Sequence, residues 1–170
     1  MKRIPMINML LTVIITFVLT VAFSATADNA DIYRIISVNS GKCMGIDDAS
    51  QKAEAGAVQW PCGKNKDHKW KLQAVEDDIY KIVNMNSGQC LAVKDGSQRK
   101  GARVIQWPCG DNKDHKWKLK ALEGEGIYKI INMRSGQCLA VENASEENEA
   151  SIIQWPCGGN MDHKWRLIED

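Results

Sequence analysis

The feature that most constrains the fold is one stretch that the sequence contains three times. Each copy reads Gln-Trp-Pro-Cys, and Asp-His-Lys-Trp then begins five positions after the Cys; the copies span residues 59–70, 106–117 and 154–165. Equivalent residues recur after 47 and then 48 positions, as Cys43, Cys90 and Cys138 show. The spacing predicts homologous units over residues 32–78, 79–126 and 127–170. A unit of this size buries too little surface to fold alone, so we expect the three to share one core.

Each unit has the composition of short strands joined by turns. In the middle unit, residues 79–85 are rich in β-branched and aromatic side chains, and Asn86-Ser87-Gly88 then has the chemistry of a turn. Further short strands are expected at residues 90–93, 104–107 and 117–119. No segment of the mature chain keeps a helical period, and three units are too few for an ordinary propeller. The sequence therefore predicts an all-β fold closed around a three-fold repeat.

Residues 1–27 have the pattern of a secretory signal peptide. Two basic residues precede an apolar run from about Met9 to Phe23, and Ala25-Thr26-Ala27 then supplies small residues for cleavage. The alternative is an uncleaved membrane anchor, because the run approaches the roughly 20 residues that span a bilayer. We expect export with cleavage, which leaves residues 28–170 as one secreted or periplasmic domain.

Charge limits the partners of this mature domain. Loss of Lys2 and Arg3 lowers the formal net charge from +1 to −1, since no acidic residue is removed. A near-neutral domain of mixed charge has no electrostatic footprint for nucleic acid or for an anionic membrane. We therefore expect neither partner once the signal is cleaved.

Six cysteines in an exported chain indicate three disulfides. One pairing repeats identically in every unit, and it joins Cys43 to Cys62, Cys90 to Cys109 and Cys138 to Cys157. A zinc site is the alternative, because each unit also contains a His, although the paired C-x₂₋₄-C spacing of such sites is missing. The disulfide pattern is favoured, and no metal or other cofactor is expected.

Several motifs of the middle unit together resemble the ricin B-type lectin repeat. They are Tyr80-x-Ile82, Ser87-Gly-Gln-Cys90-Leu-Ala-Val93, Gln106-Trp-Pro-Cys109 and Asp114-His-Lys-Trp117. The resemblance extends over the whole mature chain. It implies a β-trefoil of three repeats of about 47 residues, with a disulfide inside each repeat. It also implies a domain that binds carbohydrate without catalysis.

The family binds sugar in a shallow pocket on each repeat, where an aromatic ring stacks on the sugar and an Asp with neighbouring amides holds its hydroxyls. The resemblance assigns the stacking ring to Trp60, Trp107 and Trp155. A large flat face with a polar edge suits this role, and burial in the core is the alternative for these three residues. The tryptophans that end the repeats are expected in the core; they are Trp70, Trp117 and Trp165.

The acidic partner departs from the family pattern. Where sugar-binding repeats commonly have Asp, two residues after the first Cys, this chain has Gly45, Ala92 and Ala140. One set of substitutes lies in the following loop and consists of Asp48, Asp95 and Asn143. A second set precedes the His and consists of Asp67, Asp114 and Asp162. A carboxylate can accept bonds from two sugar hydroxyls, but each of these residues could also be a solvated turn residue.

Three further polar residues recur in every unit. His68, His115 and His163 replace a Gln that makes a structural hydrogen bond in the family, so a structural role competes with donation to a sugar and pH-dependent binding. Asn65, Asn112 and Asn160 either cap a turn or reach a ligand. Gln59, Gln106 and Gln154 are expected to be sheet residues and not ligand contacts.

The sequence thus predicts a carbohydrate-binding domain with up to three related sites for glycans or polysaccharide. Catalysis is disfavoured, because all cysteines are assigned to disulfides and no Ser, His and Asp set stands apart from the repeat. The alternative is a protein-binding trefoil, such as a receptor-binding toxin subunit or a protease inhibitor. Its loops would expose apolar residues, whereas the loops here carry Lys, Glu, Asp and Ser. A catalytic or toxin partner encoded elsewhere is compatible with either prediction.

Overall fold

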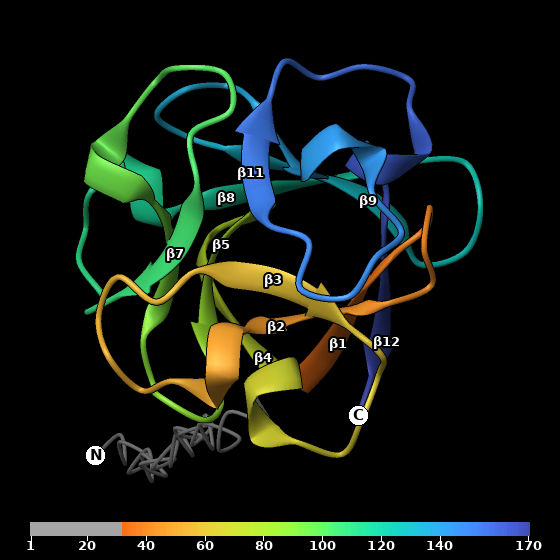
Figure 1. Cartoon of the computed structure of the whole chain (residues 1–170). Helices are drawn as coiled ribbons and strands as arrows, with labels where there is room; N and C mark the ends of the chain where they lie inside the picture. The colour runs from red at the N-terminus through yellow and green to blue at the C-terminus, as the bar shows by residue number, and fades with distance from the viewer. Residues whose placement is uncertain (1–31) are drawn as a thin grey trace, which may run out of the picture.

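The computed structural model describes residues 32–170, so the predicted signal peptide and residues 28–31 lie outside the described part of the chain. Twelve strands form a β-trefoil, which confirms the predicted fold class (Figure 1). Six of them close a barrel in which each strand pairs antiparallel with two others of the ring. In ring order they are β1 (Ile32–Ser37), β4 (Trp70–Glu76), β5 (Ile79–Asn84), β8 (Trp117–Ala121), β9 (Ile127–Asn132) and β12 (Trp165–Glu169).

The other six strands form one hairpin in each repeat, and the three hairpins cover one end of the barrel. They are β2 (Cys43–Ile46) with β3 (Ala57–Trp60), β6 (Cys90–Val93) with β7 (Val104–Trp107), and β10 (Cys138–Val141) with β11 (Ile152–Trp155). In Figure 1, β3, β7 and β11 surround a common axis. Single bridges join them there and link Gly56 to Ile105, Arg103 to Ile153 and Ser151 to Val58. The repeats are therefore paired both in the barrel and in its cap.

Six short 3₁₀ helices complete the repeats, two in each, and sequence reasoning expected only loops at these places. Three follow the first hairpin strand: η1 (Asp47–Ala49), η3 (Lys94–Gly96) and η5 (Glu142–Ala144). Three precede the last strand: η2 (Lys66–His68), η4 (Lys113–His115) and η6 (Met161–His163). Elements of three residues are too short to show a helical period in a sequence. Within residues 32–170, no helix has the length and hydropathy needed to cross a bilayer.

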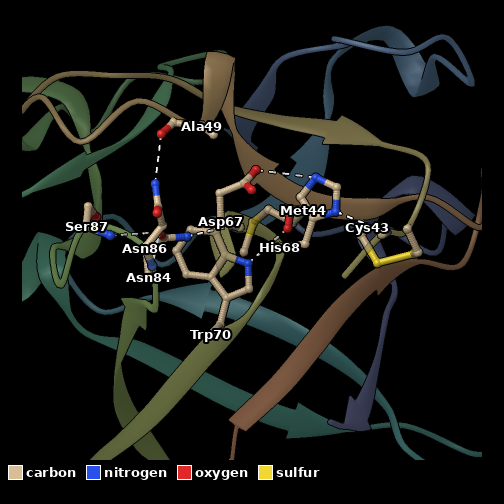
Figure 2. A network of polar contacts seen from close by, with 11 residues as sticks. Cys43, Met44, Ala49, Asp67, His68, Trp70, Asn84, Asn86 and Ser87 are labelled. Carbon is tan, nitrogen blue, oxygen red and sulfur yellow. Dashed lines mark hydrogen bonds and ion pairs between the residues drawn. A yellow bond between two sulfur atoms is a disulfide. The ribbon is translucent and has the colours of Figure 1, made fainter. Parts of the chain in front are cut away.

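The repeats share one core, as predicted from their size. Its layers repeat the same kinds of side chain, for example Ile35, Ile82 and Ile130 from the barrel strands. Trp70, Trp117 and Trp165 are fully buried, which confirms their predicted place. The indole N–H of Trp70 donates to the carbonyl of Met44 at 2.9 Å, so its one polar group is satisfied inside the core (Figure 2).

The three disulfides join the predicted pairs, Cys43–Cys62, Cys90–Cys109 and Cys138–Cys157. Each closes the same interval of 19 residues and ties the first hairpin strand to the residues that follow the second. Because all six sulfur atoms are paired with each other, none is available as a zinc ligand.

Candidate functional site

Each repeat has one cavity beside its exposed tryptophan. We call these cavities site 1, beside Trp60, site 2, beside Trp107, and site 3, beside Trp155, and their volumes are about 220, 250 and 260 Å³. All fifteen residues predicted for carbohydrate binding line them. Site 1 contains Asp48, Trp60, Asn65, Asp67 and His68; site 2 contains Asp95, Trp107, Asn112, Asp114 and His115; and site 3 contains Asn143, Trp155, Asn160, Asp162 and His163.

The cavity tryptophans end the second hairpin strand of each repeat. Successive side chains of a strand point to opposite faces, so the buried Gln106 is followed by the outward-facing Trp107. Trp60, Trp107 and Trp155 are 38%, 39% and 39% exposed. The alternative that these rings belong to the core is therefore wrong. Each presents an apolar face to solvent at the edge of a concave surface lined with polar groups.

The histidine of each site is fixed through both ring nitrogens. Nδ1 of His68 accepts a hydrogen bond from the Gly63 amide at 3.3 Å, and Nε2 lies 3.3 Å from Oδ2 of Asp67 (Figure 2). The corresponding distances are 3.1 and 3.4 Å in site 2 and 3.1 and 3.3 Å in site 3. Since Nδ1 accepts, the ring proton is on Nε2 and points at the carboxylate. Each imidazole thus orients the Asp beside it.

Because both ring nitrogens have protein partners, a structural role suits the histidines better than direct contact with a ligand. His68, His115 and His163 are 3%, 4% and 2% exposed. Burial lowers the pKa of His115 from its ordinary value of 6.5; Asp114 opposes this shift and Lys81 adds to it. A buried imidazole with a lowered pKa is neutral at pH 7, as the hydrogen bond from the Gly110 amide to its Nδ1 requires.

The Asp–His pair of site 1 packs against Gly45, one of the three positions at which an acidic partner was expected and is missing. A Cβ atom on Gly45 would lie 2.6 Å from Cδ2 of His68 and 3.2 Å from Oδ2 of Asp67. The other repeats have Ala92 and Ala140 at this position, beside the same pair, so only small side chains stand there. Oδ2 of Asp67, which belongs to η2, lies 3.2 Å from the Cβ position of residue 45, so the second set of predicted substitutes lies next to the place of the missing Asp.

The remaining predicted residues lie at the rims. Asp48, Asp95 and Asn143 have φ between 53° and 57°, a left-handed conformation that Asp and Asn tolerate better than most residues. Asn65, Asn112 and Asn160 precede η2, η4 and η6, but their side chains make no capping hydrogen bond. The capping role considered for these asparagines is therefore wrong, and their amides line the cavities instead.

Sequence reasoning missed the residues that reach each site from another repeat. Glu149 lines site 1, Glu54 lines site 2 and Gly101 lines site 3. Arg134 also lines site 2, and its guanidinium lies 3.4 Å from the Cβ position of Gly96. Glu54, Gly101 and Glu149 hold the same position in their repeats. The sequence does show that these equivalent positions differ in charge. Only the fold shows that each residue lies beside the tryptophan of a different repeat.

The fold and its three equivalent cavities define a β-trefoil with one candidate ligand site in each repeat. The sequence matches the family described as ricin-type beta-trefoil lectin domain-like over residues 20–107 and 113–170. The chain belongs to this family. No curated protein sequence matches this chain.

Solved structures show the same fold. The designed three-fold symmetric protein ThreeFoil is 33% identical with a TM-score of 0.80, and the match covers 82% of this chain and 99% of ThreeFoil. The exo-beta-1,3-galactanase 1,3Gal43A from Clostridium thermocellum is 31% identical with a TM-score of 0.81; the match covers 84% of this chain and 31% of the enzyme. The Rhizoctonia solani agglutinin is 14% identical with a TM-score of 0.74, over 85% of this chain and 98% of that one, and shows the fold alone.

Proposed function

We propose that this chain is an exported carbohydrate-binding protein that uses sites 1, 2 and 3 and performs no catalysis. The observation that carries the proposal is the same pairing in all three repeats: a half-exposed indole face beside a carboxylate fixed by a buried imidazole. An indole face stacks on the C–H face of a sugar, and a carboxylate accepts bonds from its hydroxyls. Lectins among the similar structures and the family membership support this function.

Export is part of the proposal. Three disulfides are typical of proteins that fold in an oxidising compartment, and residues 1–27 have the pattern of a signal peptide. The similar trefoil of the galactanase 1,3Gal43A is part of a longer enzyme. A separately encoded catalytic or toxin partner would give this chain the comparable task of directing another protein to a glycan.

A protein-binding trefoil remains the second candidate. It is favoured by one neighbour, a mosquitocidal holotoxin with 14% identity, of which this chain covers 18%. The residues that line the three sites include Asp, Glu and Asn, with Arg134 at site 2, and such polar surroundings suit hydroxyl groups better than an apolar protein anchor.

A glycan array probed with residues 28–170 tests the proposal. Binding to defined glycans that free sugar displaces is the expected result. The matched control is the variant with Trp60, Trp107 and Trp155 all changed to Ala, which should keep the fold and lose the signal. Binding that free sugar does not displace, or that survives this triple change, would contradict carbohydrate recognition at these sites.

A further inference from the structure

Each site is completed by a loop from another repeat, and the three loops differ in charge. We call them the crossing loops: residues 51–54 reach site 2, residues 98–101 reach site 3, and residues 146–149 reach site 1. They hold equivalent positions, and each ends with a residue of positive φ, namely Glu54 at 68°, Gly101 at 78° and Glu149 at 63°. Their backbones are thus alike, while their side chains are not.

The crossing loops are held rigidly beside the cavity tryptophans. The Glu54 amide donates to the carbonyl of Gln106 at 3.0 Å, and Nε2 of Gln106 donates back to the carbonyls of Ser50 and Lys52, both at 2.8 Å. Gln154 and Gln59 hold the loops at sites 3 and 1 in the same way. All three glutamines are fully buried. A charge carried by a crossing loop is therefore presented at a defined place next to the indole that follows the glutamine.

The charges form a graded series. Residues 146–149 read Glu-Glu-Asn-Glu, with formal charge −3. Residues 51–54 read Gln-Lys-Ala-Glu and have no net charge, and residues 98–101 read Gln-Arg-Lys-Gly, with formal charge +2. Sites built from the same tryptophan and Asp–His pair thus receive an acidic, a neutral and a basic loop.

Site 3 places a cation over its aromatic platform. Nζ of Lys100 lies 5.5 Å from the centre of the Trp155 ring. The next residue is Gly101, where the other crossing loops have Glu, so this crossing loop adds no carboxylate to the Glu142 and Asp162 that already line the cavity. This ammonium group lies beside the ring assigned to sugar stacking, where it can pair with an acidic substituent of the sugar.

Site 1 receives an acidic crossing loop where site 3 receives a basic one, and its lining contains more carboxylates. Asp47, Asp48, Asp67 and Glu149 line it, and among the described residues that line site 1 there is no Lys or Arg. Site 2 is intermediate. Its Glu54 lies 3.6 Å from Nζ of Lys94, and Arg134 lines the same cavity as Asp114.

We propose that the crossing loops make the three sites select glycans by charge. Site 3 accepts glycans with an acidic substituent, either a carboxylate or a sulfate, whereas site 1 accepts neutral glycans and repels acidic ones. A carboxylate and a sulfate both present anionic oxygens to an ammonium group, so the geometry predicts a negative charge without choosing between them. The test below compares the two groups. This inference rests on the proposed function, because it assumes that the cavities bind sugar.

The test uses single-site proteins on a glycan array that carries neutral, carboxylated and sulfated forms of the same core sugars. Trp60→Ala with Trp107→Ala leaves site 3, and Trp107→Ala with Trp155→Ala leaves site 1. Exchanging residues 98–101 with residues 146–149 in each background keeps the net charge of the protein constant. Lys100→Glu in the site 3 protein is the point variant, and Lys120→Glu, on the barrel strand β8, is its charge-matched control.

The site 3 protein should prefer acidic over neutral glycans by about tenfold at low salt, and the preference should shrink as salt screens it. The loop exchange should transfer this preference to site 1, Lys100→Glu should abolish it, and Lys120→Glu should leave it unchanged. Equal preferences before and after the exchange would overturn the charge selection while the proposed function stands. If the unmodified protein binds no glycan of the array, the proposed function fails and this inference fails with it.

Discussion

At the scale of single residues, each candidate site depends on one carboxylate that an imidazole holds in place. Oδ2 of Asp114 faces Nε2 of His115, which leaves Oδ1 to accept from a ligand. Asp114→Asn keeps the shape but removes the charge. Hydrogen bonds to a charged group are worth more than neutral ones, so this change should cost about 1 kcal/mol of binding, roughly fivefold in Kd.

The measurement is titration calorimetry with the protein that retains only site 2. Asp111→Asn is the matched control, because Asp111 is an exposed Asp of the preceding turn that pairs with Lys81 outside the cavity. An equal loss of affinity in both variants would point to general charge effects and against a ligand contact by Asp114.

The buried imidazole also predicts how stability responds to acid. Burial lowers the pKa of His115 in the folded state; Asp114 partly opposes this shift, and Lys81 adds to it. As the pH falls, this residue therefore takes up a proton in the unfolded chain before it does so in the folded one. Proton uptake by the unfolded state favours unfolding. Stability should therefore be retained above about pH 6.5 and decrease below it.

Melting temperatures measured between pH 7.5 and 5.5 test this expectation. His115→Gln should flatten part of the decrease, since Gln carries no group that titrates in that range. A pH profile that His115→Gln does not alter would mean that this imidazole contributes nothing to the acid response.

At the scale of elements, the repeats are joined through the buried glutamines of the hairpin strands. Gln106 accepts from the Ser87 hydroxyl at 2.7 Å and donates to two carbonyls of the crossing loop. Gln106→Ala leaves these buried groups without partners and should lower the free energy of unfolding by about 2–3 kcal/mol. Hydrogen exchange at residues 50–54 should quicken as well.

Gln89→Ala is the matched control for denaturant unfolding. Its amide makes one exposed hydrogen bond, to the carbonyl of Gln51, so the expected loss is below about 1 kcal/mol. Equal losses in the two variants would contradict the role assigned to Gln106.

Much of this element scale was predictable, because the signals were local or repeated. Strand composition and turn chemistry located the hairpins, and equal spacing gave the disulfides. The cavity residues came together as expected, because each set lies within one repeat. The crossing loops were missed for a physical reason: Glu54 meets Trp107, which is 53 positions away, through a closure of the trefoil that no local pattern encodes. The structural role of His68 could not be settled from the sequence either. It depends on which groups lie next to the two ring nitrogens, and packing decides that.

At the scale of the whole molecule, β3, β7 and β11 lie around a common axis (Figure 1), and each of these strands ends at the tryptophan of one site. Under the proposed function, one molecule engages several glycans of a polysaccharide or of two surfaces. Effective concentration raises the avidity of linked sites by about 10²–10⁴ over one site. The protein should therefore cross-link glycan-coated beads, and a single-site variant should bind the beads without cross-linking them. Cross-linking by a single-site variant would indicate association between copies of the chain.

The tryptophans should divide into two classes that separate binding from folding. Trp107 is 39% exposed, so Trp107→Ala should cost about 1–3 kcal/mol at site 2 and weaken retention on a glycan surface, with a small change in melting temperature. Trp117 is fully buried, and Trp117→Ala should lower the free energy of unfolding by about 3–5 kcal/mol. Each added change at Trp60 and Trp155 should reduce avidity further, until the triple variant no longer binds. Surface plasmon resonance and thermal melts of the same samples distinguish the classes. If Trp107→Ala unfolds the domain as Trp117→Ala does, its indole supports the core, and stacking at site 2 must be assigned to another group.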